Sequence, residues 1–150
     1  MAGRDREQAR REARDLLPLF GLNGFEQSYP AALSGGMRQR AALLRTFLCQ
    51  QDLILLDEPL GALDALTRRI MRRWLLEVWA RFRQTVVFVT HDVDEAIYLS
   101  DRVYVFSPRP GHILGALEIA LPRPREERLT SEPRFAAYRE ELLHCLGVEP

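Results

Sequence analysis

An apolar run that ends in two acids, Leu53–Leu56 followed by Asp57 and Glu58, constrains the fold of this chain more than any other feature. Four consecutive aliphatic residues without alternation predict a strand that is buried on both faces of a parallel sheet. The two carboxylates would then lie beyond the carboxyl end of that strand, where open α/β sheets bind their ligands. Because Mg²⁺ prefers hard oxygen ligands, Asp57 suits a magnesium site. The run therefore predicts an α/β fold with a functional edge at residue 57.

A second apolar run, residues 85–90, leads into His91 and Asp92. An amphipathic helix is expected between the two runs, and a strand–helix–strand order favours parallel pairing with right-handed crossovers. Because the carboxyl ends of parallel strands meet at one edge of a sheet, we expect Asp57, Glu58 and His91 to face one crevice.

Periodicity and turn residues predict the other elements. The predicted helices cover about 4–20, 34–50, 66–82 and 132–146, with a short helix that Asp92 caps and that has Glu95 three residues on. The predicted strands are 53–57, 85–90, 102–106 and 112–121, the last two antiparallel across the turn 107–111.

The helix over 66–82 is expected to be amphipathic. Its apolar stripe recurs every four residues, at Leu66, Ile70, Trp74, Val78 and Phe82. The arginines among them, Arg68, Arg69, Arg72, Arg73 and Arg81, are interpreted as a solvated face rather than a nucleic-acid site.

Composition excludes several classes of protein. The 150 residues suffice for one domain, and 47% hydrophobic with 28% charged residues indicates a globular chain. The 21 basic residues balance the 21 acidic ones, which gives no reason to expect nucleic-acid binding.

No apolar run approaches the roughly 20 residues of a membrane span, and the charged start has no signal-peptide core. Cys49 and Cys145 lack metal-ligand spacing and are expected to be reduced.

Ser34, Gly35 and Gly36 open the helix predicted over 34–50. Free backbone N–H groups at such a helix end suit a phosphate, and two glycines permit its close approach. Ser34 would also serve as a plain helix cap, worth about 1 kcal/mol. A cap alone does not require two glycines.

Four motifs in order give the chain a family resemblance. LSGGMRQR at 33–40 and LILLDEP at 53–59 resemble the signature motif and the Walker B strand of ABC-transporter ATPases. LGALD at 60–64 resembles the D-loop, and VTHDVDEA at 89–96 resembles the segment with the switch histidine. The resemblance implies the C-terminal part of a P-loop NTPase (ABC ATPase) domain, α/β with a mostly parallel sheet flanked by helices. Residues 1–50 would be part of the helical signature subdomain, and residues 51–150 would be the C-terminal part of the RecA-like core with a C-terminal hairpin and helix.

The resemblance also implies a role for each matching residue. Asp57 would hold Mg²⁺, Glu58 would orient the attacking water, and His91 would contact the γ-phosphate. The residues implied to bind ATP on an opposing subunit, or to cross the dimer interface, are Ser34, Gly35, Gly36, Gln39 and Asp64.

Expected cofactors and partners follow from the same resemblance. They are ATP and Mg²⁺, a second ATPase protomer in a homodimer, membrane permease subunits and, indirectly, a periplasmic binding protein, with no nucleic acid. The chain would be cytoplasmic and peripheral on the inner face of the cell membrane. The turn SPRPG at 107–111 favours the nitrate, sulfonate and taurine group of bacterial importers, and hence a small anion as cargo.

One family motif is absent from these residues. They contain no G-x-x-x-x-G-K-[ST] phosphate loop and no lysine, so the phosphate-loop half is expected to be missing and the chain inactive alone. An ATPase subunit, or the C-terminal part of one, is the leading hypothesis. The alternative is a non-enzymatic remnant or interaction partner. A DNA-associated ABC ATPase is disfavoured, since the chain lacks a coiled-coil insertion and a basic excess.

Overall fold

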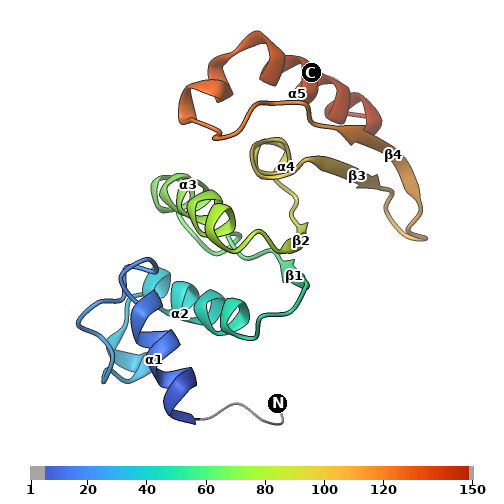
Figure 1. Cartoon of the computed structure of the whole chain (residues 1–150). Coiled ribbons are helices and arrows are strands. Elements are labelled where there is room, and N and C mark those ends of the chain that lie inside the picture. Colours follow the sequence, from blue (N-terminus) through green and yellow to red (C-terminus); the bar gives the residue numbers. More distant parts are fainter. Residues whose placement is uncertain (1–5, 149–150) are drawn as a thin grey trace. The chain divides into compact units, whose positions relative to one another are not determined.

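The computed structural model describes residues 6–148, in which helices and strands alternate from α2 to β3 (Figure 1). The α-helices are α1 (Arg6–Leu16), α2 (Gly35–Leu48), α3 (Ala65–Phe82), α4 (Val93–Leu99) and α5 (Pro133–Cys145). The strands are β1 (Leu53–Asp57), β2 (Thr85–Val89), β3 (Arg102–Phe106) and β4 (Ile113–Glu118), and short 3-10 helices cover Pro30–Ala32 and Glu127–Ser131. The α/β class is confirmed. The start expected for the first helix, at Arg4, lies outside the described residues.

The chain divides into two compact units. The first unit is Met1–Leu56 with Val78–Val87, and the second unit is Asp57–Glu77 with Phe88–Pro150. These units are groups of residues in mutual contact, so the subdomain boundary expected between residues 50 and 51 stays a prediction. No described helix is both long and apolar enough to cross a bilayer.

Aromatic rings form the centre of the first unit. Phe47 of α2 is fully buried, and its ring meets Phe20 edge-on at 6.1 Å and Phe82 at 5.1 Å. Gly21 follows Phe20 with φ +60°, and a Cβ there would meet the guanidinium of Arg40, at the far end of a flexible side chain. Glycine is therefore favoured where the chain leaves this core, because its backbone is left-handed there.

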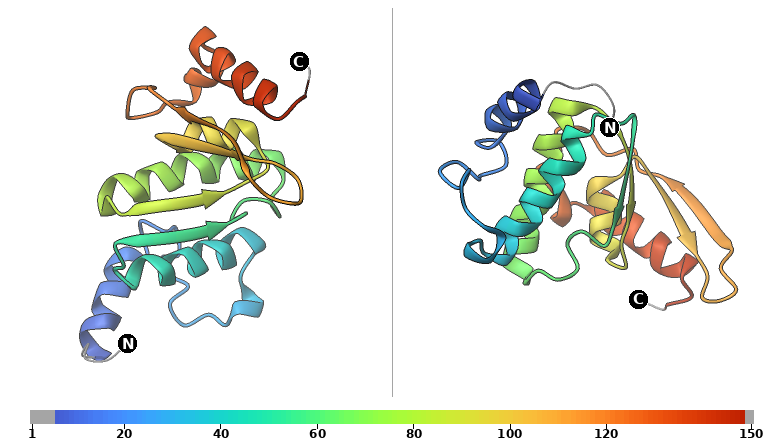
Figure 2. Two further views of the ribbon diagram at one scale, coloured as in Figure 1. Left: turned by 90° about the vertical axis from the view of Figure 1, so that its right-hand side faces the viewer. Right: turned by 90° about the horizontal axis from the view of Figure 1, so that it is seen from below.

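β1 and β2 form a parallel pair (Figure 2). Thr85 N–H donates to Asp52 O at 3.0 Å, and Glu58 N–H donates to Val89 O at 2.9 Å, so the register advances in the same direction on both strands. Ile54 and Leu56 are buried while Leu53 and Leu55 are exposed. The expectation that the strand at Leu53–Leu56 is buried on both faces is therefore wrong for this structure, because no described segment covers the face of Leu53 and Leu55.

The second unit packs helices α4 and α5 around the antiparallel hairpin β3–β4. Arg102 pairs with Glu118 and Val105 with Gly115 across the hairpin. A Cβ on Gly115 would lie 3.2 Å from Cys145 Sγ, so glycine makes room for α5 against β4. β3 pairs with no described strand other than β4, and the parallel pairing expected for three strands holds for β1 and β2 alone. The core of this unit consists of Ile97, Tyr98, Val105, Leu117, Ile119, Leu121, Phe135 and Leu142.

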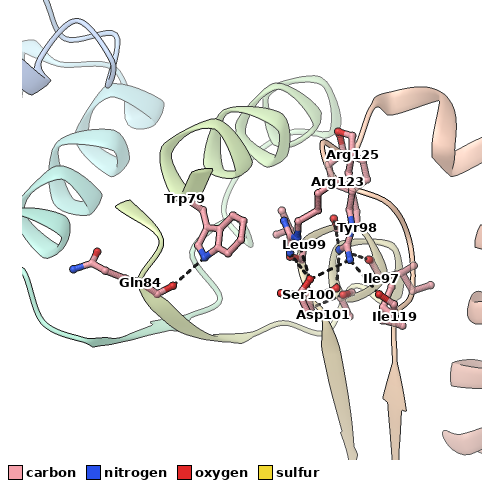
Figure 3. Close-up of polar contacts among 11 residues, drawn as sticks. Trp79, Gln84, Ile97, Tyr98, Leu99, Ser100, Asp101, Ile119, Arg123 and Arg125 are labelled. Atoms are coloured by element: carbon pink, nitrogen blue, oxygen red, sulfur yellow. Dashed lines mark hydrogen bonds and ion pairs between the residues drawn. The ribbon is translucent and has the colours of Figure 1, made fainter. Parts of the chain in front are cut away.

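A buried arginine joins two segments of this core (Figure 3). Arg125 Nη1 donates to the carbonyl oxygens of Ile97, Tyr98 and Ser100 at 3.1, 3.0 and 2.6 Å, at the C-terminal end of α4. A cation there complements the helix dipole and satisfies carbonyls that have no partner within the helix. Burial lowers the pKa of Arg125 to about 10, so the guanidinium stays charged at neutral pH.

The predicted apolar stripe of α3 is partly wrong. Leu66 and Ile70 are 68% and 61% exposed, whereas Met71, Trp74, Leu75 and Val78 are buried. A spacing of four residues advances about 40° beyond a full turn at each step, so a strict four-residue stripe drifts around the helix. The observed positions alternate spacings of three and one, which keeps them on one face.

Candidate functional site

The backbone of Glu58 is held in an unusual conformation directly after β1. Its φ is +42°, in the left-handed region that non-glycine residues rarely adopt. Its N–H donates to Val89 O at 2.9 Å, which ties the residue to the end of β2. Such conformations cost on the order of 1–3 kcal/mol and persist where the surroundings hold them. The fold therefore tolerates an unfavourable backbone conformation that fixes the position of Glu58.

Glu58 and His91 are in contact. His91 Nδ1 lies 3.1 Å from Glu58 Oε1, and the two side chains are 68% and 51% exposed. The contact confirms that the residues following β1 and β2 meet at one edge of the parallel pair. Both groups remain accessible to a ligand from solvent.

The turn after Glu58 supports its carboxylate. Gly61 N–H donates to Glu58 O at 3.1 Å, and a Cβ on Gly61 would lie 3.2 Å from Glu58 Oε2. The missing side chain of Gly61 thus leaves space for the carboxylate. Asp64 ends the turn and caps α3, accepting from Thr67 N–H at 3.0 Å and from the Thr67 hydroxyl at 2.6 Å.

Asp57 lies exposed at the carboxyl end of β1. The described residues contain no group of three or more side chains that could hold a metal by themselves. A lone exposed carboxylate nevertheless fits Mg²⁺, which often binds protein through one or two carboxylates and takes its other ligands from phosphates and water. The donor set is therefore compatible with a magnesium–nucleotide complex.

The Ser34–Gln39 segment belongs to the first unit. Ser34 caps α2, accepting from Met37 N–H at 3.2 Å, as the sequence predicts. A Cβ on Gly35 would meet nothing within 4 Å, so the end of this helix is open. Gln39 is half-buried one turn further on. The structure thus groups Asp57, Glu58, Asp64 and His91 in one unit and the glycine motif in the other.

Sequence reasoning missed a buried ionic network beside His91. Glu95 is 3% exposed, accepts from the Thr90 hydroxyl at 2.8 Å and lies 3.7 Å from Arg68 Nε. Burial raises the pKa of Glu95, and the hydrogen bond from Thr90 opposes that rise. The reciprocal cap expected for α4 is half present: Asp92 accepts from Glu95 N–H, but the Glu95 carboxylate bonds Thr90 instead. Arg68 is 27% exposed and pairs with Asp92 and Glu95, so it lies at the margin of the solvated face assigned to it. The exposed members of that set are Arg69, Arg73 and Arg81.

Comparison with known proteins identifies the family of this chain. The profile of the family described as ABC transporter matches residues 2–61. A Brucella abortus protein described as ATP-binding is 46% identical over 146 residues, which cover 97% of this chain and 56% of the relative. The chain belongs to the ABC-transporter ATP-binding family. It spans about half the length of the curated relatives it matches.

Two relatives of this ABC-family chain have names that state a cargo. The formylaminopyrimidine import ATP-binding protein ThiZ of Halalkalibacterium halodurans is 41% identical, covering 93% of this chain and 55% of the relative. The aliphatic sulfonates import ATP-binding protein SsuB of Bacillus cereus is 44% identical, covering 88% and 51%. A solved ABC transporter, described as metal-chelate type and inward-facing, superposes with a TM-score of 0.63 at 26% identity, over 87% of this chain and 51% of that one.

Proposed function

We propose that this chain supplies the water-orienting glutamate, the switch histidine and the signature motif of an ATP-hydrolysing subunit that powers a bacterial importer. The contact between Glu58 and His91 carries the proposal, because it pairs a carboxylate with an imidazole at the edge where the nucleotide phosphates would lie. Glu58 would accept a hydrogen bond from the attacking water and hold it in line with the γ-phosphoryl group. His91 would donate a hydrogen bond to the charge that develops on the phosphate.

Asp57 would hold Mg²⁺ in the bound complex. The metal would neutralise charge on the β- and γ-phosphate oxygens. Asp57 itself carries a negative charge that opposes nucleotide binding in the absence of a metal. The chain would therefore require Mg²⁺ for any productive contact between this edge and ATP.

The test is a fusion in which a phosphate-loop half from an ABC ATPase precedes this chain. We expect the fusion to release phosphate from ATP and His91→Ala to lose most of that activity. His112→Ala is the matched control, because His112 is also exposed but bonds Ser107 Oγ at 2.8 Å, in a turn outside the site. Equal rates in His91→Ala and the parent would contradict the role of His91. A fusion that binds ATP without turnover would favour the alternative of a non-enzymatic interaction partner.

The 150 residues alone should bind ATP weakly or not at all. A phosphate loop normally provides most of the backbone donors, and the lysine, that hold the β- and γ-phosphates, and this sequence contains neither the motif nor a lysine. Calorimetric titration with Mg·ATP measures this directly. A dissociation constant in the low micromolar range would overturn the expectation.

We further propose a second protomer, a membrane permease and a small anionic cargo such as a sulfonate or nitrate. The name of SsuB supports a sulfonate, whereas that of ThiZ states a formylaminopyrimidine. The cargo is thus tested at the transporter: uptake of a labelled sulfonate by vesicles that contain the fusion and its permease should depend on Glu58. Uptake of a formylaminopyrimidine instead would contradict the anion assignment.

A further inference from the structure

Arg68 contacts two functional segments of the second unit at once. Its Nη2 donates to Leu63 O at 3.0 Å, in the turn that follows Glu58. Its Nη1 lies 3.5 Å from Asp92 Oδ2, and its Nε lies 3.7 Å from Glu95 Oε1. One planar guanidinium therefore joins the turn before α3 to the loop and helix that follow β2. An arginine suits this arrangement because its donors point in several fixed directions.

The loop that carries His91 is anchored on both sides of that residue. The Thr90 hydroxyl donates to Glu95 Oε2 at 2.8 Å and accepts from Asp92 N–H at 3.0 Å. Asp92 Oδ1 accepts from Glu95 N–H at 3.0 Å. None of these bonds uses the imidazole, so the anchors leave His91 free to contact Glu58.

The network is held by a carboxylate that is costly to bury. Glu95 is 3% exposed, and a buried charge is tolerated only when it is paired and hydrogen-bonded. Arg68 supplies the opposite charge and Thr90 the hydrogen bond. Losing either partner should displace Glu95, and with it the residues on both sides of His91.

We propose that Arg68 is a positioning residue that, through Glu95 and Asp92, sets where the His91 imidazole stands relative to the Glu58 carboxylate. The catalytic meaning of that position rests on the proposed function, but the position itself is measurable without nucleotide. Because the same guanidinium holds Leu63 O, a displacement of the turn that ends at Asp64 would reach the His91 loop through Arg68.

The experiment records imidazole signals by NMR in the 150-residue chain labelled at histidine. The chain has three histidines, and the signal lost in His91→Asn identifies His91, leaving His112 and His144 as internal references. In Arg68→Met we expect the His91 signal to move by more than its linewidth while the two references stay in place. Thr90→Val, which deletes one hydroxyl, should move the same signal in a fold that is less disturbed.

The matched control is Arg139→Met. Arg139 of α5 pairs with Asp94 at 2.7 Å, and Asp94 lies in α4, the helix that also contains Glu95. The Arg139→Met substitution therefore also removes an ion pair from α4, but that pair touches neither Thr90 nor Glu95. We expect lower stability in urea with an unmoved His91 signal. If both Arg68→Met and Thr90→Val only lowered stability and left the His91 signal unmoved, the proposal would be overturned. If Arg68→Met fails to fold, Thr90→Val alone decides. A moved His91 signal together with full activity of His91→Ala in the fusion would support the positioning role of Arg68 and contradict the proposed function.

Discussion

The two motif regions of this chain are built in opposite ways. Glu58 is fixed by its left-handed backbone, by the bond from its N–H to Val89, by the close approach of Gly61 and by contact with His91. The bonds that Ser34 accepts come from its own helix, from Met37 N–H to its hydroxyl and from Arg38 N–H to its carbonyl oxygen, and the space beside Gly35 is empty to 4 Å. A group that acts on a reacting atom must be positioned by its own fold. A helix end that receives a phosphate needs exposed N–H groups and space.

The largest expected effect tests the fixed region. Glu58→Gln in the fusion protein should keep nucleotide binding and lower turnover by about 10²–10³-fold, the range for removing one preorganised catalytic group. The amide fills the same space but orients and activates water poorly. Phosphate release at saturating ATP measures turnover, and a fluorescent nucleotide measures binding. Turnover at the parent rate would show that the strain at Glu58 serves some purpose other than catalysis.

A charged side chain in the open Ser34–Gly36 segment should prevent the ATP-dependent dimer from forming. Gly36→Asp places a carboxylate where the γ-phosphate of an opposing protomer would sit, and like charges at an interface cost on the order of several kcal/mol. In the Glu58→Gln fusion, ATP-dependent dimer should form, and adding Gly36→Asp should abolish it while ATP still binds the phosphate loop. Analytical ultracentrifugation with and without ATP measures the dimer. Equal amounts of dimer in both proteins would mean that the Ser34–Gly36 segment serves as a helix cap only.

The two helix caps should respond differently to pH. Ser34→Ala should cost about 1 kcal/mol of unfolding free energy at every pH, because its hydroxyl does not titrate. Hydrogen bonds, first from the Thr67 hydroxyl and then from its N–H, lower the pKa of Asp64 below its ordinary 3.8. The unfolded state therefore takes up the proton first as the pH falls, so the stabilisation by Asp64 is complete above about pH 3.8 and is lost as the pH falls through the lower folded value.

Urea unfolding checks both expectations. It is measured for Ser34→Ala, Asp64→Asn and the parent between about pH 2.5 and 7, a range that roughly covers the ordinary titration of aspartate. The gap between parent and Asp64→Asn should close in acid, while the gap for Ser34→Ala should stay constant. Parallel curves for both variants would mean that the charge on Asp64 does not contribute to the cap.

Two glycine substitutions give the smallest expected effects. Gly35→Ala enters empty space in a helix and should raise unfolding free energy by about 0.4–1 kcal/mol. Gly61→Ala meets Glu58 Oε2 at 3.2 Å, and the half-exposed carboxylate can move aside, so stability should change by less than about 0.5 kcal/mol. The His91 imidazole signal should nevertheless shift in Gly61→Ala and stay in place in Gly35→Ala. The reverse pattern would contradict the contrast between the two regions.

Prediction from the sequence succeeded where neighbouring residues decide the outcome. Ser34 as a cap, β1 ending at Asp57, and the turn between β3 and β4 all depend on a few adjacent residues. The meeting of Glu58 and His91 was also predictable, because parallel strands bring their carboxyl ends to one edge. The role of each site residue stays a prediction.

Features that depend on distant residues escaped prediction. The exposed face of β1 depends on what covers it, and no described segment does. Arg68 was assigned to a solvated face because it lies among four other arginines, yet its pairing with Glu95, twenty-seven positions later, leaves its side chain only 27% exposed. Arg125 had no local signal at all, since the carbonyls it caps lie at the end of α4.

The order and identity of the motifs reside in the chain itself, because capping, strand formation and glycine's conformational freedom act over a few residues. The strained conformation of Glu58 and the ion pair between buried Glu95 and part-buried Arg68 are instead decided by packing. Each is unfavourable on its own and persists only because hydrogen bonds from other segments hold it. Such conformations arise from the sum of many distant contacts, which is why the folded structure was needed to reveal them.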